Sequence, residues 1–333
     1  MASTGICRHM ENILVIRLKA IGDVVFTLPA IRALHEHFPA AEITFLTSKE
    51  NAPLLRGFPE VGKVVALDRA VLRGGNPLKV VPEFFHLLRR LRAGDFSLVV
   101  DFQGFGETAW LARLTGAPRR WGSVYGSGRR WAYTRGVTRQ EKVHPAEWNL
   151  RLLADCGVKA GSLKNSFLLP AEALDAAQDF LRENKLEPGH PTLVIQPFTS
   201  SAQKNWPLAN FLAVARHWRE RGVQVIFVGG PADGEPLVPA SAEHFCTATR
   251  LPLLVSAGLV QLATLTLGGD TGLGHLAVAQ GKRVVMLMMH KNPGACVPFQ
   301  HAEWAVTPGT GPISQISVET VLTETGKVLQ GTN

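Results

Sequence analysis

The sequence has few cysteines and no long apolar run. Its four cysteines (Cys7, Cys156, Cys246 and Cys296) are scattered, and no two of them form a Cys-x-x-Cys pair. This spacing argues against a structural zinc site and against a disulfide framework, and it fits a reducing cytoplasm. No apolar stretch approaches the roughly eighteen residues that a membrane span needs. Residues 1–10 lack the apolar core of a signal peptide, so we expect a cytoplasmic protein.

Two common nucleotide-binding fingerprints are also missing. The segment after the first apolar run reads Lys19-Ala20-Ile21-Gly22-Asp23, which is not the Gly-x-Gly-x-x-Gly of dehydrogenases, and the sequence contains no Gly-x-x-x-x-Gly-Lys-[Ser/Thr] phosphate loop. Periplasmic binding proteins also have two α/β domains, but they would need the signal peptide that we do not find. No cysteine, histidine or acidic cluster has the spacing of metal ligands, so we expect no required metal.

Charge is distributed unevenly along the chain. The net charge is +8; residues 1–170 hold 24 Lys+Arg against 14 Asp+Glu, which gives +10, and the remainder hold 11 against 13, which gives −2. The densest basic segment is 113–142. It is either a solvated basic face or the site of an anionic partner, such as nucleic acid, a membrane surface or a phosphorylated acceptor. Nucleic acid is the weakest of these candidates, because the chain carries no recognised nucleic-acid module.

The pattern of apolar segments predicts an α/β protein. A chain of 333 residues exceeds the usual size of a single core. Strand-like runs alternate with helical patterns in both halves, which is typical of parallel sheets covered on both faces. We therefore expect two doubly wound, Rossmann-like domains, residues 1–170 and 171–333, facing each other across a cleft. Whether the last helix packs back on the first domain stays open.

Some segments have less regular patterns. Residues 23–38 predict a helix that Pro29 kinks or restarts, and residues 233–245 predict a weaker helix. Segment 113–142 predicts short strands and loops. Residues 251–260 fit no clear pattern, and residues 283–289 predict the final strand.

Two turns organise these predictions. Lys19–Asp23 and Gly268–His275 each follow an apolar run and open a helix, a geometry that places backbone N–H groups at the carboxyl edge of a parallel sheet. Each turn contains an acid. Asp23 is either a catalytic base or the N-cap of its helix. Asp270 either accepts hydrogen bonds from sugar hydroxyls or is an N-cap, and His275 is expected to face the core.

Several motifs together resemble the bacterial lipopolysaccharide heptosyltransferases, glycosyltransferase family 9. The resemblance covers nearly the whole chain. The most specific matches are the opening segment Ile13–Ala30 and the donor-site signature Asp270–Ala277. The others are Asp101-Phe102-Gln103-Gly104, His144-Pro145-Ala146-Glu147, Lys204-Asn205-Trp206-Pro207 and Gly229-Gly230-Pro231-Ala232-Asp233.

The resemblance implies a GT-B fold and inverting transfer of heptose from ADP-heptose to the inner core of lipopolysaccharide. Asp23 would be the base. We expect donor contacts from Lys204, Asp233, Asp270, Thr271, Gly272 and His275. Acceptor contacts are expected from Arg17, Lys19, Gly22, Gln103 and Arg120. The partners would be a nucleotide-sugar donor and an anionic glycolipid acceptor, at the cytoplasmic face of the inner membrane by peripheral contact, with no nucleic acid and no required cofactor.

The sequence also departs from the family pattern. Glu107 replaces a cation, Gly274 replaces a serine or similar residue, and residues 288–293 replace a Gly-Pro-Thr-type turn. Segment 251–267 looks shortened against the usual helix plus strand. These departures keep two alternatives open: a transferase of the same fold that moves another sugar to a surface glycan, or a non-catalytic nucleotide-sugar or polyanion binder.

Overall fold

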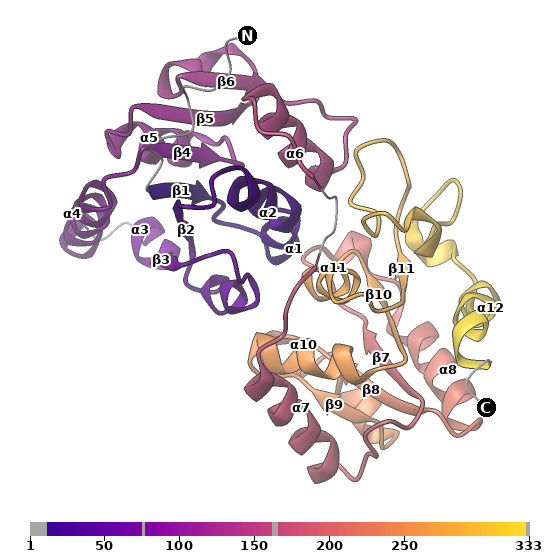
Figure 1. The fold of residues 1–333 in the computed structure, drawn as a ribbon. Helices are drawn as coiled ribbons and strands as arrows, with labels where there is room; N and C mark the ends of the chain where they lie inside the picture. Colours follow the sequence, from indigo (N-terminus) through magenta and orange to yellow (C-terminus); the bar gives the residue numbers. More distant parts are fainter. Residues whose placement is uncertain (1–11, 75–76, 162–165, 331–333) are drawn as a thin grey trace. The chain divides into compact units, whose positions relative to one another are not determined.

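The chain folds into two compact units. The computed structural model describes residues 12–74, 77–161 and 166–330, and it divides into residues 1–164 and 165–333 (Figure 1). The division lies a few residues before the expected boundary at 170. Phe167 is buried, and its backbone N–H donates to the carbonyl oxygen of Ala279 in the second unit. Within the described residues, no helix combines the length and apolar composition that crossing a membrane requires.

The first unit is a doubly wound α/β domain. The label η denotes a 3-10 helix. Its elements are β1 (Asn12–Ile16), α1 (Ile21–Val25), α2 (Leu28–His37), β2 (Glu42–Ser48), η1 (Ala52–Gly57), β3 (Lys63–Leu67), α3 (Arg69–Arg73), α4 (Pro77–Ala93), β4 (Leu98–Asp101), α5 (Gly106–Leu114), β5 (Arg119–Val124), η2 (Ser127–Ala132), β6 (Arg135–Thr138) and α6 (Pro145–Asp155).

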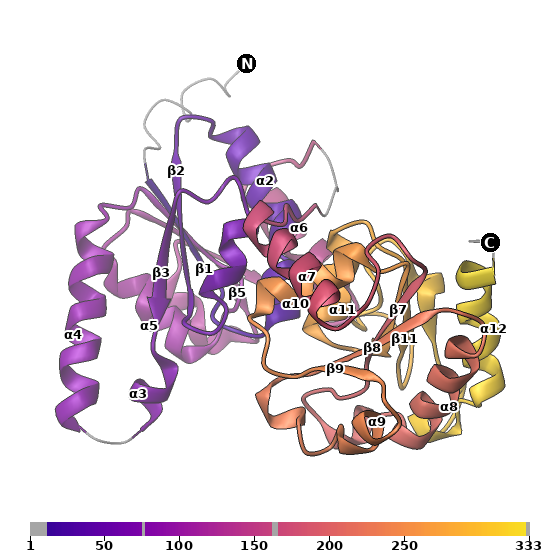
Figure 2. The same cartoon turned by 90° about the horizontal axis from the view of Figure 1, so that it is seen from below.

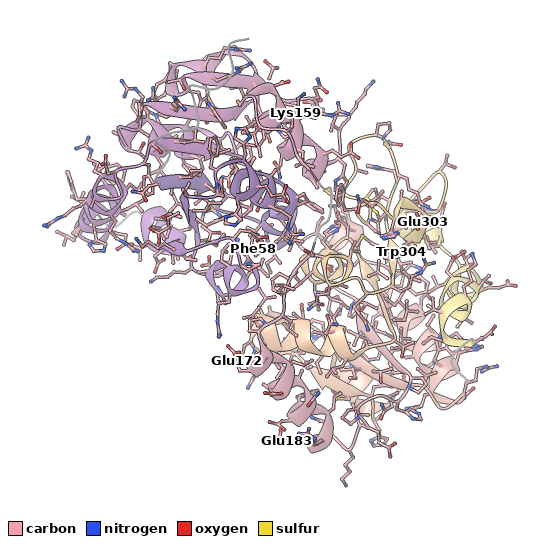
Figure 3. The ribbon with its side chains drawn as sticks, in the orientation of Figure 1. Phe58, Lys159, Glu172, Glu183, Glu303 and Trp304 are labelled. Carbon is pink, nitrogen blue, oxygen red and sulfur yellow. The ribbon has the colours of Figure 1, made fainter. Side chains whose placement is uncertain are left out.

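All six strands of this unit are parallel, in the order β3-β2-β1-β4-β5-β6. The apolar run of β1 is completely buried because helices cover both faces of a parallel sheet. The core extends to η1, where Phe58 (Figure 3) packs edge to face against Phe45 of β2. The strand order reverses between β1 and β4, where Ile16 lies beside Asp101. Such a reversal is the usual ligand-binding place of an open α/β sheet.

The second unit repeats this architecture. Its elements are α7 (Ala171–Glu183), β7 (Thr192–Gln196), η3 (Ala202–Lys204), α8 (Leu208–Arg219), β8 (Gln224–Val228), η4 (Pro231–Asp233), α9 (Val238–Ala242), β9 (Cys246–Ala248), α10 (Leu253–Leu262), β10 (Leu265–Gly269), α11 (Gly272–Ala279), β11 (Val284–Leu287), η5 (Ala302–Trp304), β12 (Ala305–Val306), η6 (Ile313–Gln315) and α12 (Val318–Leu329).

Its six parallel strands have the order β12-β11-β10-β7-β8-β9, which is the same topology as in the first unit. Here the order reverses between β7 and β10, where Gly268 lies beside Gln196. Helix α12 packs against α8, β10 and β11 of its own unit. Trp206 and Trp218 lie in the core and donate their indole N–H groups to Ile316 and Thr325, respectively.

The structure corrects several predicted elements. Segment 251–267, which looked too short for a helix and a strand, contains the whole of α10 and the start of β10. Helix α10 is packed against α7, β7 and α11. Its own residues are therefore apolar on nearly every side, and its sequence shows no alternation of polar and apolar faces from which a helix could be predicted. The strand predicted over 283–289 is not the last one, since the two-residue β12 pairs with β11. Of the weak helix expected over 233–245, only the five residues of α9 are α-helical, and η4 ends at Asp233 where the helix was predicted to begin.

Two other predictions are confirmed. The helix expected over 23–38 is divided into α1, which ends at Val25, and α2, which begins at Leu28. Pro29 lies in the first turn of α2, where its missing N–H is harmless. The Arg-rich segment forms β5, η2 and β6, which are short strands and a turn of 3-10 helix.

Candidate functional site

Asp23 lies just after β1, at the carboxyl edge of the first sheet. Its Oδ2 atom forms an ion pair with Arg17 Nη2 at 2.6 Å and accepts the backbone N–H of Ala20 at 3.1 Å. Ala20 is the N-cap of α1, and Asp23 occupies the third helical position. The N-cap interpretation of Asp23 is therefore wrong, although its carboxylate does satisfy the N–H of the capping residue.

Arg17 sets the orientation of this carboxylate. The Arg17 side chain is only 12% exposed, and its Nη1 donates to the carbonyl oxygen of Phe102 at 2.9 Å. The guanidinium therefore connects the ends of β1 and β4 while it holds one oxygen of Asp23. Among the described residues, the other oxygen, Oδ1, takes part in no hydrogen bond or ion pair. With 32% of its side chain exposed, Asp23 can offer that oxygen to a substrate proton.

Gln103 connects the two turns at the point where the strand order reverses. It is completely buried, its Oε1 accepts the N–H of Leu18 at 2.9 Å, and its Nε2 donates to Glu107 at 3.2 Å. Glu107 also pairs with Arg69 at 3.3 Å. The side chain predicted to contact the acceptor is thus bonded within the protein, and the acid that replaces the family's cation belongs to the same network.

Asp101 shapes the turn that carries Gln103. Its Oδ1 accepts the backbone N–H groups of Gln103 and Gly104 at 2.9 and 3.0 Å, and its Oδ2 accepts the hydroxyl of Tyr133 at 2.7 Å. Complete burial raises the pKa of Asp101. Burial also raises the pKa of Tyr133, and the neighbouring Asp101 adds to this rise. Sequence reasoning missed Tyr133 because nothing local distinguishes it from the other aromatic residues of the Arg-rich segment.

Lys19 and Gly22 share the edge on which Asp23 lies. The Lys19 ammonium lies 5.7 Å from the centre of the Phe105 ring, at the turn after β4. Gly22 is a buried residue of α1, and its carbonyl oxygen accepts the N–H of Phe26.

Arg120 does not join this group. It is the second residue of β5 and lies beside Val99, toward the amino end of the strands. Its Nε donates to the carbonyl oxygen of Ala132 at 2.9 Å, and its Nη1 donates to that of Ala117. Because Ala117 precedes β5, the guanidinium points away from the carboxyl edge. The structure therefore separates Arg120 from the other predicted acceptor residues and gives it a role in joining the end of η2 to the segment before β5.

The second unit places three predicted donor residues in one network. Asp270 follows β10; its Oδ2 pairs with Lys204 Nζ at 2.9 Å, and its Oδ1 lies 2.9 Å from His275 Nε2. Burial by itself would raise the pKa of Asp270, but the hydrogen bonds and charges of His275 and Lys204 outweigh it and lower this pKa to about 2. The Asp270 hydrogen bond in turn raises the pKa of Lys204.

Thr271 is the N-cap of α11. Its Oγ1 accepts the N–H of Gly274 at 3.1 Å and donates to Gln196 Oε1 at 2.5 Å, which connects α11 to the end of β7. The N-cap interpretation of Asp270 is therefore wrong, since the next residue has that role. Gly272 is the first residue of α11, and its backbone N–H is one of those that have no acceptor inside a helix. It can therefore face an anion.

A pocket of about 210 Å³ lies beside this network. Lys204 and Asp270 line it together with Met288, Met289 and Cys296. Its wall thus includes part of the segment 288–293 that departs from the family pattern. Lys204 keeps 45% of its side chain exposed, so its ammonium can reach a ligand in the pocket. Sequence reasoning missed Cys296, because a lone cysteine in a loop carries no motif.

The remaining predicted features have simpler surroundings. Asp233 follows β8 and accepts the N–H of Gly230 at 2.6 Å, which closes η4. A Cβ atom at Gly274 would lie 3.1 Å from Met286 Cε and 3.3 Å from Thr271 Oγ1, so the glycine suits the tight packing behind the cap. Across the described parts of both units, no group of three or more His, Cys, Asp or Glu side chains is placed to hold a metal ion.

Comparisons with known proteins agree with this architecture. The model of glycosyltransferase family 9 (heptosyltransferase) matches residues 84–320. Lipopolysaccharide heptosyltransferase 1 of Pseudomonas aeruginosa is 29% identical over 298 residues, which cover 85% of this chain and 80% of that protein.

Solved structures match nearly the whole chain. The glycosyl transferase family 9 structure from Veillonella parvula has a TM-score of 0.86 at 21% identity and covers 98% of this chain and 99% of its own. E. coli heptosyltransferase WaaC with ADP-2-deoxy-2-fluoro heptose has a TM-score of 0.75 at 19% identity, covering 95% of this chain and 99% of its own. Both units are thus included in the match, which confirms the expected GT-B fold with two Rossmann-like domains.

Proposed function

The chain belongs to glycosyltransferase family 9, and on this premise we propose that it transfers heptose from ADP-heptose to the inner core of lipopolysaccharide. The curated relative that is 29% identical is a lipopolysaccharide heptosyltransferase. The acceptor is Kdo-lipid A or a heptosyl acceptor built on it, which makes the second substrate an anionic glycolipid.

The position of Asp23 is the observation that carries the mechanistic part of the proposal. A carboxylate is exposed at the carboxyl edge, beside the reversal of strand order, with Oδ2 held by Arg17 and Ala20. A base needs one oxygen that is fixed in direction and free of competing protein donors, and Oδ1 meets this requirement among the residues that the structure describes. Arg17 and Lys19 add positive charge at the same edge, where acceptor phosphates or carboxylates would bind.

The reaction is a displacement at the anomeric carbon. The acceptor hydroxyl oxygen forms a bond to that carbon, and its proton passes to Asp23 Oδ1. The bond between the anomeric carbon and the phosphate oxygen breaks, and ADP leaves with the electron pair. Attack from the face opposite the leaving group inverts the anomeric configuration.

Charge on the leaving diphosphate is balanced by groups of the second unit. We assign this role to the Lys204 ammonium and the first N–H groups of α11, including that of Gly272. A diphosphate would draw Lys204 from its ion pair with Asp270, whose released carboxylate oxygen can accept a sugar hydroxyl. These positive groups make a metal unnecessary, so we expect turnover to persist in EDTA. The enzyme would act at the cytoplasmic face of the inner membrane.

Replacing Asp23 with Asn tests the mechanism. The assay measures ADP release from ADP-heptose with a Kdo-lipid A acceptor, and calorimetry measures the affinity for ADP, with UDP, GDP and CMP for comparison. We expect Asp23→Asn to lower kcat by about 10²–10⁴-fold, because the amide cannot take the proton. The dissociation constant for ADP should stay within about twofold.

Asp68→Asn is the matched control. Asp68 is also a partly exposed acid at a helix start of the first unit. Its Oδ1 accepts the N–H of Val71, a bond that asparagine can take, and its Oδ2 forms an ion pair with the exposed Lys49 just as Asp23 pairs with Arg17. A loss of less than tenfold in Asp23→Asn would exclude Asp23 as the base. A preference for another nucleotide would exclude the heptose assignment, and nucleotide binding without turnover in the unmodified protein would favour a binding protein.

A further inference from the structure

Helix α4 carries an apolar stripe on its solvent side. Leu78, Val81 and Phe85 are 84%, 50% and 62% exposed, whereas Leu87 and Leu91 on the opposite side are buried. The spacing of three and then four residues puts the three exposed side chains on one face of the helix. Helix α4 therefore differs from an ordinary amphipathic helix, because it carries apolar side chains on its solvent face as well as on its core face.

The same face becomes basic toward the end of the helix. Arg89 and Arg92 continue the stripe at the next helical spacings, and Arg90 is also exposed. At 1.5 Å per residue, the apolar part from Leu78 to Phe85 extends over about 10 Å and the basic part from Arg89 to Arg92 over about 5 Å. Such a face fits the boundary of a membrane, where apolar side chains reach the acyl region and long basic side chains stay among the head groups.

The charge of the surrounding elements is strongly positive. Residues 77–139, which run from the start of α4 to the residue after β6, hold 11 Lys+Arg against 4 Asp+Glu, which gives +7 of the net +8 of the chain. One of the four acids, Asp101, is completely buried. An occupant of this face should therefore be anionic as well as apolar, which describes a bilayer that contains acidic phospholipids.

Neighbouring helices extend the surface with aromatic residues. Helix α4 packs against α5, and α5 packs against η2. Trp110 of α5 and Trp131 of η2 are 57% and 48% exposed, and their ring centres lie 4.4 Å apart. Tryptophan side chains of this kind are typical of the interface between membrane and water. Figure 2 shows α4 as the outermost helix of the first unit.

The topology places the stripe on the side of the unit where Asp23 lies. Helix α4 begins after β3 and α3, at the carboxyl edge of the sheet, and ends before β4 begins, at the amino edge. Leu78, Val81 and Phe85 occupy its first half. A membrane that contacts this half lies toward the edge that carries Asp23.

We propose that the face formed by α4, α5 and η2 docks on an anionic phospholipid bilayer, with Leu78, Val81 and Phe85 inserted and the arginines of the face bound to head-group phosphates. Docking there brings a lipid-anchored acceptor to the catalytic edge, and this consequence rests on the proposed function.

Vesicle co-sedimentation tests the proposal with the full chain. The vesicles contain phosphatidylethanolamine and phosphatidylglycerol at 3:1, with phosphatidylcholine vesicles for comparison. We expect saturable binding to the anionic vesicles that weakens as NaCl rises from 0.1 to 1 M, because the Debye length falls from about 10 to about 3 Å. The triple variant Leu78→Ser, Val81→Ser and Phe85→Ser should bind at least about tenfold more weakly, since three inserted side chains are lost.

The control variant replaces two similarly exposed apolar side chains that lie outside the proposed docking face. Leu168 and Val238 of the second unit are 57% and 59% exposed, and Leu168→Ser with Val238→Ser should leave vesicle binding unchanged. Unchanged melting temperatures verify that both variants fold. Equal vesicle binding by the triple variant, or no binding by the original protein, would overturn the proposal. So would self-association that the triple variant abolishes, because a second copy would then cover the face.

Activity separates this proposal from the proposed function. The triple variant should keep the original kcat with a soluble, deacylated acceptor and lose rate only with acceptor embedded in vesicles. If the original protein transfers no heptose to either acceptor but still binds the anionic vesicles through α4, the proposed function fails and the docking surface stands.

Discussion

Replacing Asp270 with Asn should destabilise the second unit by about 2.5 kcal/mol at pH 7. In the folded protein its pKa is about 2, against an ordinary value of 3.8. This difference approaches two pH units, and each unit corresponds to about 1.4 kcal/mol of preference for the ionised form. Asparagine carries no charge to pair with Lys204, so most of this contribution is lost. The Asp270 side chain is only 19% exposed, which keeps solvent screening small.

The pH dependence of this stability difference provides a second, independent test. A carboxyl group whose pKa is depressed by folding stabilises the protein above its unfolded pKa, and this contribution disappears as the pH falls through its folded pKa. The difference in unfolding free energy between the original protein and Asp270→Asn should therefore be constant from pH 7 to pH 5. It should shrink only below about pH 4, toward zero near pH 2.

Urea unfolding followed by tryptophan fluorescence measures this difference, because Trp206 and Trp218 lie in the core of the second unit. Glu243→Gln is the control: it removes the ion pair of Glu243 with Arg216, whose side chain is 47% exposed, and should change the stability much less. A difference below about 0.5 kcal/mol at pH 7, or one already lost at pH 5, would refute the assigned ion-pair energy.

Two further substitutions test the turn after β4. Gly104→Ala should cost more than about 3 kcal/mol in urea unfolding, since the residue has φ of 70° and its Cβ would lie 2.0 Å from the carbonyl oxygen of Ser123. Gly116→Ala has a similar φ of 81° with open space around the Cβ, so it should cost only about 1 kcal/mol, and equal costs would contradict the predicted clash. Tyr133→Phe should cost about 1–3 kcal/mol, because it leaves Oδ2 of the buried Asp101 without its donor. An unchanged denaturation midpoint would show that this hydrogen bond adds no net stability.

Local patterns in the sequence were sufficient for most of the fold. Buried parallel strands such as β1 are continuous apolar runs, and amphipathic helices such as α12 repeat at helical spacing, so both could be predicted from a few neighbouring residues. The glycine turns after β1 and β10 could also be predicted, because the strand, the turn and the start of the helix are consecutive in the chain. Helix α10 and strand β12 escaped prediction: the first has no polar face and the second is too short to show a period.

The candidate site likewise has a part that local sequence predicts and a part that it does not. The sequence by itself determined that Asp23, Lys204 and Asp270 stand at turns of the type that binds ligands, because the identity and spacing of these residues are local properties. Only the tertiary structure decided their partners: Arg17 for Asp23, and Lys204 and His275 for Asp270. It also turned Arg120 away from the carboxyl edge. The pairings of Arg17 with Asp23 and of Asp270 with His275 form within one turn, where the side-chain geometry decides them. The pairing of Lys204 with Asp270 depends on the strand order, which places β7 beside β10, and no local pattern specifies that order.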